Sequence, residues 1–331
     1  MEILIYGGGA VGLGIASCLL KSQQKVNILA RSDTCAALKS QGLLRNGIFG
    51  ECYFLPDQFE CVTNLDEIRK DKKFDYILVC VKSYDSFTSA RDLSSHKQLF
   101  KNKTKIVLFQ NGWGNAEIFA EFFPRNKIYN ARVITGFVRK QKNRVTITVH
   151  AEPIHIGSIF NADCLCLQEL ATVINNGDIP CEVYPPIAED LWAKMLYNCA
   201  LNPLSAILNV PYGKLGEQKW TRDIMDNIVA EVYQVMSKLG YRTHWPTPQE
   251  YLEVFYTRLL PATAEHESST LQDIHCGKKT EIDFLNGAVV KLAGEVGIPV
   301  PYNSTLYALL KFLENENRAN KGTDNMRLVN S

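Results

Sequence analysis

Long apolar runs are missing from this sequence. Segments such as residues 76–81 (YILVCV) are far shorter than the roughly 20 apolar residues that span a bilayer. Met1 to Tyr6 leads directly into glycines, without the basic and apolar stretches of a signal peptide, so we expect none. The ten cysteines include no C-x-x-C pair, and several, such as Cys18 and Cys80, lie within apolar runs. This is typical of reduced thiols, and we expect a cytoplasmic protein that does not contact a membrane.

An excess of charge of one sign is missing as well. The 36 Lys and Arg residues nearly balance the 35 Asp and Glu residues, and the net charge is +1. No basic stripe or base-reading motif is present, which argues against nucleic acid as a partner. The six histidines are dispersed without metal-ligand spacing, so no metal is expected. What the sequence has is 331 residues with 46% hydrophobic content, enough for two globular domains.

The first 150 residues alternate between strand-like and helix-like segments. Strands are expected at residues 3–6, 25–30, 74–81 and 105–109, and the last two are almost entirely apolar, as is typical of strands covered on both faces of a parallel sheet. Helix-like stretches separate them, and this alternation predicts a doubly wound parallel sheet. The later segments 144–150 and 153–156 resemble an antiparallel strand pair at the edge of that sheet.

The second half of the chain has a different pattern, which begins after Pro185-Pro186. Helices are expected at residues 188–209, 219–239, 249–260, 281–296 and 303–315. Gly297, followed by two prolines, predicts a helix end. We therefore predict an α/β fold with an N-terminal Rossmann-type doubly wound parallel sheet in residues 1–184. A C-terminal all-helical domain follows in residues 185–331, and ligands usually bind in the cleft between such domains.

A glycine-rich turn follows the first predicted strand. It consists of Gly7, Gly8, Gly9, Ala10, Val11 and Gly12, and a helix and a second strand come next. In such a frame Gly7 permits the tight turn, Gly9 the approach of a pyrophosphate, and Gly12 the close packing of helix on strand. The helix N-terminus would then attract the phosphates. A flexible structural turn is the alternative, but the strand–turn–helix–strand context favours a dinucleotide site.

The residue after the second strand indicates which dinucleotide is bound. An NAD site normally has Asp or Glu there, to hold the ribose 2′-hydroxyl, whereas this chain has Arg31. A guanidinium can form charge-assisted hydrogen bonds to a 2′-phosphate, so we predict NADP(H). Asp33 lies close by, and Arg31 as a solvated surface residue is the alternative.

A narrow polar stripe marks the helix predicted at residues 188–209. Lys194, Asn198 and Asn202 are spaced four residues apart among mostly apolar neighbours. A solvated helix face usually carries more charges over a wider arc, so the stripe favours a position facing a cleft, although a hydrated face stays open.

A second polar segment has a purely structural explanation. Thr280 fits an N-cap with Asp283 in the capping-box position, and acids such as Glu281 favour the first helical turn. Spacing alone therefore does not assign Glu281 to a site.

From near the first residue to about residue 315, the sequence resembles the ketopantoate reductases (2-dehydropantoate 2-reductases). The matching segments are the GGGAVG turn, residues 81–82 (VK), 110–114 (QNGWG), 155–157 (HIG), 191–208 (LWAKMLYNCALNPLSAIL), 268–274 (SSTLQDI) and 279–287 (KTEIDFLNG). Their order and approximate spacing agree with that family.

The resemblance implies roles for individual residues. Lys194 would be the general acid, and Glu281 would hydrogen-bond at the substrate. Other residues would contact cofactor or substrate: Lys82 near the cofactor, Asn111 near the nicotinamide, Asn198 and Asn202 in the substrate pocket, and Ser269 at the substrate carboxylate. His266 stands where the family often has Asn, three residues before that serine, which leaves the exact substrate open.

The implied reaction is the NADPH-dependent reduction of ketopantoate to pantoate, a step of pantothenate and coenzyme A biosynthesis. Charge that develops on the ketone oxygen would be stabilised by the ammonium of Lys194, which donates the proton. Glu281 would help to keep Lys194 protonated. Reduction of another small 2-oxo acid, or a non-catalytic NADP(H) sensor, are the alternatives. A homodimer is left open.

Overall fold

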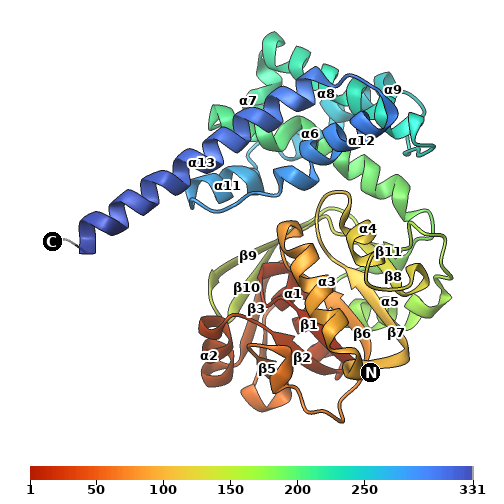
Figure 1. The fold of residues 1–331 in the computed structure, drawn as a ribbon, viewed down its shortest axis with the longest axis vertical. Coiled ribbons are helices and arrows are strands. Elements are labelled where there is room, and N and C mark those ends of the chain that lie inside the picture. Colours follow the sequence, from red (N-terminus) through yellow and green to blue (C-terminus); the bar gives the residue numbers. More distant parts are fainter. Residues whose placement is uncertain (330–331) are drawn as a thin grey trace. The chain divides into compact units, whose positions relative to one another are not determined.

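The computed structural model describes the backbone of residues 1–329 and the side chains of residues 1–317. The chain forms two compact units (Figure 1). One unit contains residues 1–111 and 115–187, and the other contains residues 112–114 and 188–331. The first is built on sheets and the second on helices, as the sequence predicts.

The first unit is built on an eight-stranded sheet in the order β12-β11-β8-β7-β6-β1-β2-β5. Its strands are β1 (Glu2–Tyr6), β2 (Lys25–Leu29), β5 (Glu60–Val62), β6 (Phe74–Val79), β7 (Phe100–Leu108), β8 (Ile128–Arg132), β11 (Ile154–Gly157) and β12 (Cys181–Val183). All neighbouring strands are parallel except β8 and β11. The predicted doubly wound parallel sheet is therefore confirmed.

Both faces of this sheet are buried, which is why central strands such as β1 and β6 are apolar along most of their length. In β1, Ile3 and Ile5 belong to one hydrophobic core, and the intervening Leu4 belongs to the other. Helices α1 and α5 pack in the first core, and α3 and α4 pack in the second. The helices of this unit are α1 (Ala10–Lys21), α2 (Ser32–Gln41), α3 (Ser86–Ser95), α4 (Asn115–Ala120) and α5 (Gln168–Asn176).

A second, four-stranded sheet packs against α1. Its order is β4-β3-β10-β9, with β3 (Leu43–Gly47), β4 (Cys52–Phe54), β9 (Thr135–Gln141) and β10 (Arg144–His150). The aromatic ring of Phe137 lies so close to α1 that a Cβ on Gly14 would approach it to 2.3 Å. Glycine at position 14 therefore lets β9 cross directly over the helix.

The predicted pairing of segments 144–150 and 153–156 is wrong. Both segments form strands, but β10 pairs antiparallel with β9 in the small sheet. The next strand, β11, pairs antiparallel with β8 in the large sheet. A short connection between two strands suggested a hairpin, whereas here the chain passes from one sheet to the other.

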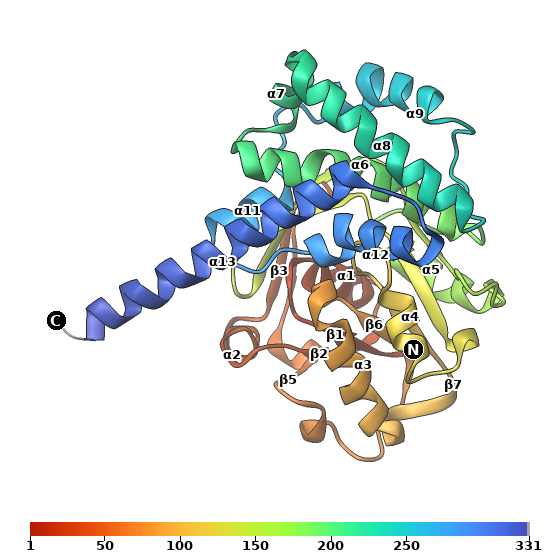
Figure 2. The same ribbon diagram turned by 45° about the horizontal axis from the view of Figure 1, so that its top comes forward.

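The second unit is helical. Its elements are α6 (Ile187–Leu208), α7 (Tyr212–Glu217), α8 (Lys219–Lys238), α9 (Pro248–Val254), a π-helical turn (Phe255–Leu259), α10 (Leu260–Ala262), α11 (Ser269–His275), α12 (Asn286–Val296) and α13 (Pro301–Val329). Helices α12 and α13 lie side by side (Figures 1 and 2). The backbone N–H of Asn303 donates to the buried carboxylate of Glu231 at 2.9 Å, which fixes the start of α13 on α8.

Residues 112–114 belong to the helical unit although they are far from it in sequence. The N–H of Trp113 donates to the carbonyl oxygen of Phe284 at 2.9 Å. Its indole lies 4.7 Å from that of Trp192, between ring centroids. Gly112, at φ +81°, permits this approach, because a Cβ there would lie 2.3 Å from the same carbonyl oxygen.

The helix predicted at residues 281–296 begins later than expected. A 3₁₀ turn occupies Ile282–Phe284, and α12 begins at Asn286. Gly297 ends α12 in the left-handed conformation, as predicted. In the part of the chain that the structure describes, no helix is long and apolar enough to cross a membrane.

Candidate functional site

The glycine turn has the geometry of a dinucleotide-binding loop. Gly7 adopts φ +118°, and the N–H groups of Gly7 and Gly8 both donate to the carbonyl oxygen of Leu29 at the end of β2. A Cβ on Gly12 would lie 2.0 Å from the carbonyl oxygen of Gly7. The first and last glycines are therefore required by the fold itself, which brings the start of α1 directly onto β1.

The N-terminus of α1 is available to an anion. Gly9 occupies the N-cap, and no side chain among the described residues caps this end. The first N–H groups of a helix carry a partial positive charge, so the turn offers the donors that a pyrophosphate needs.

Arg31 lies at the end of β2, where it is the N-cap residue of α2 and is exposed. Its neighbour Asp33 is paired with Lys142 at 2.6 Å. The hydrogen bond from Lys142 holds the pKa of Asp33 below its usual value. The negative charge that could oppose a phosphate near Arg31 is therefore balanced by a lysine.

Lys82 and Asn111 follow neighbouring parallel strands, and hydrogen bonds join their loops. Lys82 comes after β6 and Asn111 comes after β7. The carbonyl oxygen of Asn111 accepts from Ser83 Oγ at 2.5 Å and from Asn115 Nδ2 at 2.9 Å. Gln110 Nε2 bridges to the carbonyl oxygen of Lys82 at 3.4 Å. The structure therefore holds both predicted residues at the carboxyl end of the sheet, next to the glycine turn on β1.

In the helical unit, α6 carries the predicted polar stripe. Lys194 and Asn198 are half-buried, and Asn202 is buried. The hydroxyl of Tyr212 donates to Asn202 Oδ1 at 2.5 Å, and Ser268 Oγ donates to the backbone oxygen of Asn202 at 3.4 Å. The last residue of the stripe is therefore held in a buried network and does not lie on a hydrated face.

The SST segment divides into a buried serine and an exposed one. Ser268 is the N-cap of α11, and its Oγ accepts from the N–H of Leu271 at 2.9 Å. Ser269, the residue predicted to bind substrate, is the first residue of α11 and is exposed. The ring of His266 lies 5.3 Å from that of Tyr212, and partial burial lowers the pKa of His266.

The predicted capping box around Glu281 is wrong. Asp283 accepts hydrogen bonds from Tyr307 and Lys311 of α13 instead of capping a helix. Thr280 is anchored to Glu314, whose carboxylate accepts from its N–H at 2.6 Å and from its hydroxyl at 2.5 Å. Glu281 is buried and precedes the 3₁₀ turn. Thr280 Oγ1 also accepts from the N–H of Ile282 at 3.2 Å, so the threonine caps the 3₁₀ turn, but Asp283 does not complete a capping box.

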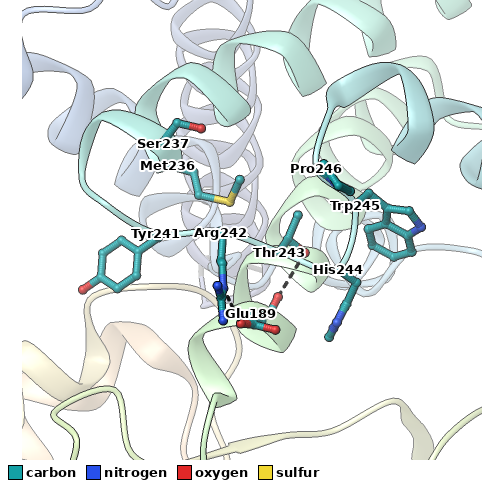
Figure 3. A pocket seen from close by; sticks show the side chains of 9 residues that line it. All are labelled: Glu189, Met236, Ser237, Tyr241, Arg242, Thr243, His244, Trp245 and Pro246. Atoms are coloured by element: carbon teal, nitrogen blue, oxygen red, sulfur yellow. Dashed lines mark hydrogen bonds and ion pairs between the residues drawn. The ribbon is translucent and has the colours of Figure 1, made fainter.

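A hollow of about 470 Å³ lies elsewhere in the helical unit (Figure 3). It is lined by Glu189, Met236, Ser237, Tyr241, Arg242, Thr243, His244, Trp245 and Pro246. Arg242 Nε donates to Glu189 Oε1 at 2.7 Å across it. None of the predicted site residues lines this hollow. Among the described residues, no group of three or more His, Cys, Asp or Glu side chains could hold a metal ion.

Both units match models of known protein families. Residues 3–160 match the model described as ketopantoate reductase PanE/ApbA, and residues 186–314 match that of its C-terminal part. The chain belongs to the ketopantoate reductase family.

Relatives in this family match along most of the chain. The 2-dehydropantoate 2-reductase of Aquifex aeolicus is 32% identical over 315 residues, covering 95% of this chain and 97% of that protein. The enzyme of the same name from Vibrio cholerae is 32% identical over 241 residues, covering 72% of this chain and 78% of that protein.

Solved structures show the same fold. A PanE/ApbA family ketopantoate reductase from Ralstonia eutropha superposes with a TM-score of 0.82 at 25% identity, covering 96% of this chain and 100% of that one. D-mandelate dehydrogenase with NADH and anilino(oxo)acetate gives 0.84 at 22% identity, covering 96% and 100%, which shows the fold alone. These matches confirm three predictions: that the chain is a ketopantoate reductase family member, that it is an oxidoreductase, and that its cofactor is NADP(H).

Sequence reasoning missed several side chains that hold the predicted residues. Tyr212 contacts Asn202 across the loop between α6 and α7, and no spacing rule indicates that contact. The role of Ser268 could have been predicted from the sequence, because a serine at the N-cap usually accepts a hydrogen bond from the backbone N–H three residues later. No sequence pattern indicates the hydrogen bonds of Ser83 and Asn115 to Asn111, since these bonds depend on the order of strands in the sheet.

Proposed function

We propose that this protein reduces 2-dehydropantoate (ketopantoate) to pantoate with NADPH, in pantothenate and coenzyme A biosynthesis. The observation that carries the proposal is the family match in both units, together with a glycine turn and an arginine at the positions that NADPH requires. We assign residues 1–184 as the NADP-binding domain and residues 185–331 as the helical substrate and catalytic domain.

The residues of the first unit fit the cofactor. The glycine turn leaves open space next to Gly9, where an added Cβ would meet only the carbonyl oxygen of Cys80, at 4.0 Å. We propose that residues 7–12 hold the pyrophosphate, that Arg31 holds the 2′-phosphate, and that Lys82 and Asn111 lie along the nicotinamide half. When bound, NADPH supplies the hydride that reduces the ketone at C2 to a secondary alcohol.

Lys194 is the proposed general acid. Negative charge develops on the ketone oxygen during reduction, and an ammonium aimed at that oxygen stabilises the charge and donates the proton. Desolvation favours the neutral form of a lysine, and a nearby carboxylate favours the charged form. We propose that Glu281 hydrogen-bonds at the substrate and keeps Lys194 protonated at neutral pH.

The other residues of the helical unit are proposed to bind the substrate. Asn198 and Asn202 extend the stripe of Lys194 along α6, and amides can bind both hydroxyl and carboxylate groups. Ser269, exposed at the start of α11, is the proposed contact of the substrate carboxylate. His266 lies near the start of α11. We propose that it influences which 2-oxo acid fits the substrate pocket.

His266 also supports a second candidate, the reduction of another small 2-oxo acid. Its imidazole packs against Tyr212, at a position where the family resemblance leads us to expect the smaller amide of an asparagine. The chemistry at C2 would be the same, with a different group beyond it. A non-catalytic NADP(H) sensor is the third reading, although a sensor would have no need for Lys194, Glu281 and Ser269 together.

We further propose that the enzyme works in the cytoplasm. The support is that all ten cysteines are free thiols, most of them buried. A homodimer stays a prediction.

The proposal is tested by incubating the purified protein with NADPH and ketopantoate and identifying the product by mass spectrometry. Pantoate should form in amounts equal to the NADPH consumed. A Lys194→Ala preparation serves as the control for contaminating reductases. Absence of pantoate, with NADPH still bound by the protein, would refute the activity and leave the cofactor assignment intact.

A further inference from the structure

Arg139 of β9 reaches from the small sheet to the end of the glycine turn. Its Nη1 donates to the carbonyl oxygen of Gly8 at 3.1 Å and to Thr34 Oγ1 at 2.9 Å. Thr34 lies in the first turn of α2, three residues after Arg31. A strand outside the parallel sheet therefore brings a second guanidinium to the carboxyl end of β2.

The charge of Arg139 is not balanced. It forms no ion pair within the part of the chain that the structure describes, although it is half-buried. Burial lowers the pKa of Arg139; the charge of Asp33 opposes this effect, and the charge of Arg31 adds to it. Asp33 itself is paired with Lys142. Two guanidiniums and one lysine thus face a single carboxylate, and the half-buried cation has lost solvation without gaining a counterion.

The position of this cluster corresponds to one part of the cofactor. In Rossmann-type domains the residue after the second strand of the βαβ unit lies at the adenosine ribose, on the 2′ side. Arg31 occupies that place, and Arg139 bridges the glycine turn and the start of α2 beside it. An anion at the ribose would restore the charge balance that the protein lacks on its own. Planar guanidiniums suit phosphate oxygens because they donate paired hydrogen bonds.

We propose that Arg139 binds the ribose 2′-phosphate of NADPH together with Arg31, and so determines the preference of this enzyme for NADPH over NADH. This inference rests on the cofactor assignment of the proposed function. It adds a residue from the small sheet to a site otherwise built from the glycine turn and the end of β2. Nη1 is engaged by the oxygens of Gly8 and Thr34, so Nη2 and Nε are the donors that remain for the phosphate.

The competing explanation is a structural clamp. Arg139 could merely fasten the glycine turn to α2 through Gly8 and Thr34. A clamp would shape the pocket for the whole dinucleotide, so its loss would weaken NADPH and NADH alike. If Arg139 instead binds the 2′-phosphate, its loss would weaken only the binding of nucleotides that carry this phosphate.

The test is a set of fluorescence or calorimetric titrations of the full-length protein with four ligands: NADPH, NADH, 2′,5′-ADP and 5′-AMP. Arg139→Gln should weaken NADPH and 2′,5′-ADP by about 10- to 100-fold, the usual effect of losing a charge-assisted contact, and leave NADH and 5′-AMP nearly unchanged. Arg139→Lys keeps the positive charge but not the paired donors of the guanidinium, so its affinities for NADPH and 2′,5′-ADP should lie between those of wild type and Arg139→Gln. Lys140→Gln removes a charge from the exposed neighbouring residue of the same strand and should change none of the four affinities.

Equal weakening of NADPH and NADH by Arg139→Gln, or no change in either, would overturn the proposal. If the Gln variant does not fold, Arg139→Lys provides the test. If Arg139 binds the 2′-phosphate, the Lys variant should lose part of the wild-type preference for NADPH over NADH. Failure of the proposed reaction is recognised separately, since wild-type protein would then bind NADPH in preference to NADH without reducing ketopantoate.

Discussion

The phenolic hydroxyl of Tyr212 donates a hydrogen bond to Asn202 Oδ1 at 2.5 Å. Burial raises the pKa of Tyr212 far above its usual value, so this hydroxyl keeps its proton and acts as a donor at any physiological pH. The amide of Asn202 is therefore oriented with its oxygen on the tyrosine. Its NH₂ group then remains for the substrate contact that we propose for Asn202.

Tyr212→Phe should raise the KM for the 2-oxo acid about tenfold and leave kcat and NADPH affinity nearly unchanged. The reason is that Asn202 loses the bond that orients it, and an unsatisfied buried acceptor costs about 1–3 kcal/mol. Steady-state kinetics measure both constants. Tyr197→Phe is the matched control, because that hydroxyl bonds to Thr263 Oγ1 at 2.5 Å and not to Asn202. Equal effects of the two variants would show that Tyr212 is structural only.

Arg31→Asp should weaken NADPH binding far more than NADH binding. The substitution replaces a cation at the 2′-phosphate with a carboxylate that repels the phosphate and can accept from a ribose hydroxyl. Titration with each nucleotide measures the effect, and Lys140→Gln again serves as a charge control. If both nucleotides weaken equally, Arg31 does not contact the 2′-phosphate.

The buried guanidinium of Arg45 gives a prediction about the stability of the first unit. Arg45 is paired with Asp178, which also bonds to Lys21 at 2.7 Å. Burial pulls the pKa of Asp178 upward, but hydrogen bonds from Lys21 and Arg45 outweigh it and hold that pKa below its usual value. The carboxylate therefore stabilises the fold at pH above its unfolded pKa, and this contribution is lost as the pH falls through the lowered folded pKa.

Asp178→Asn should lower the free energy of unfolding at pH 7 by about 3–5 kcal/mol, because it leaves Arg45 buried without a counterion. The difference from wild type should shrink as the pH falls below the unfolded pKa and through the lowered folded pKa of Asp178, where wild type loses the same charge. Urea unfolding at several pH values measures this. Asp71→Asn, which breaks an exposed pair with Arg69, should have little effect. A constant difference at every pH would contradict the assignment.

The sequence predicted those features that depend on local pattern. The apolar strands, the glycine turn and the end of α12 at Gly297 follow from periodicity and from backbone conformation. The placement of β9 and β10 did not follow, because a chain can leave one sheet for another without any local signal. The anchoring of Thr280 by Glu314 was also hidden, since a capping box explained the same residues from their spacing alone.

Lys194→Ala should reduce kcat by about 10²- to 10⁴-fold, the usual range for removal of a general acid. NADPH affinity should stay nearly intact, since the proposed cofactor residues lie in the first unit. Glu281→Ala should also slow turnover, and the double variant should be less impaired than the product of the two single effects if they act together. A folded Lys194→Ala enzyme that keeps most of its turnover would show that the stripe on α6 does not supply the proton.

The measurement that tests the central claim most directly is kcat/KM for a panel of small 2-oxo acids, each assayed with NADPH and with NADH. Ketopantoate with NADPH should give the highest value of the panel, and its value with NADH should be lower. Activity on another 2-oxo acid with none on ketopantoate would contradict the substrate assignment, and turnover of no member of the panel would contradict the enzyme assignment altogether.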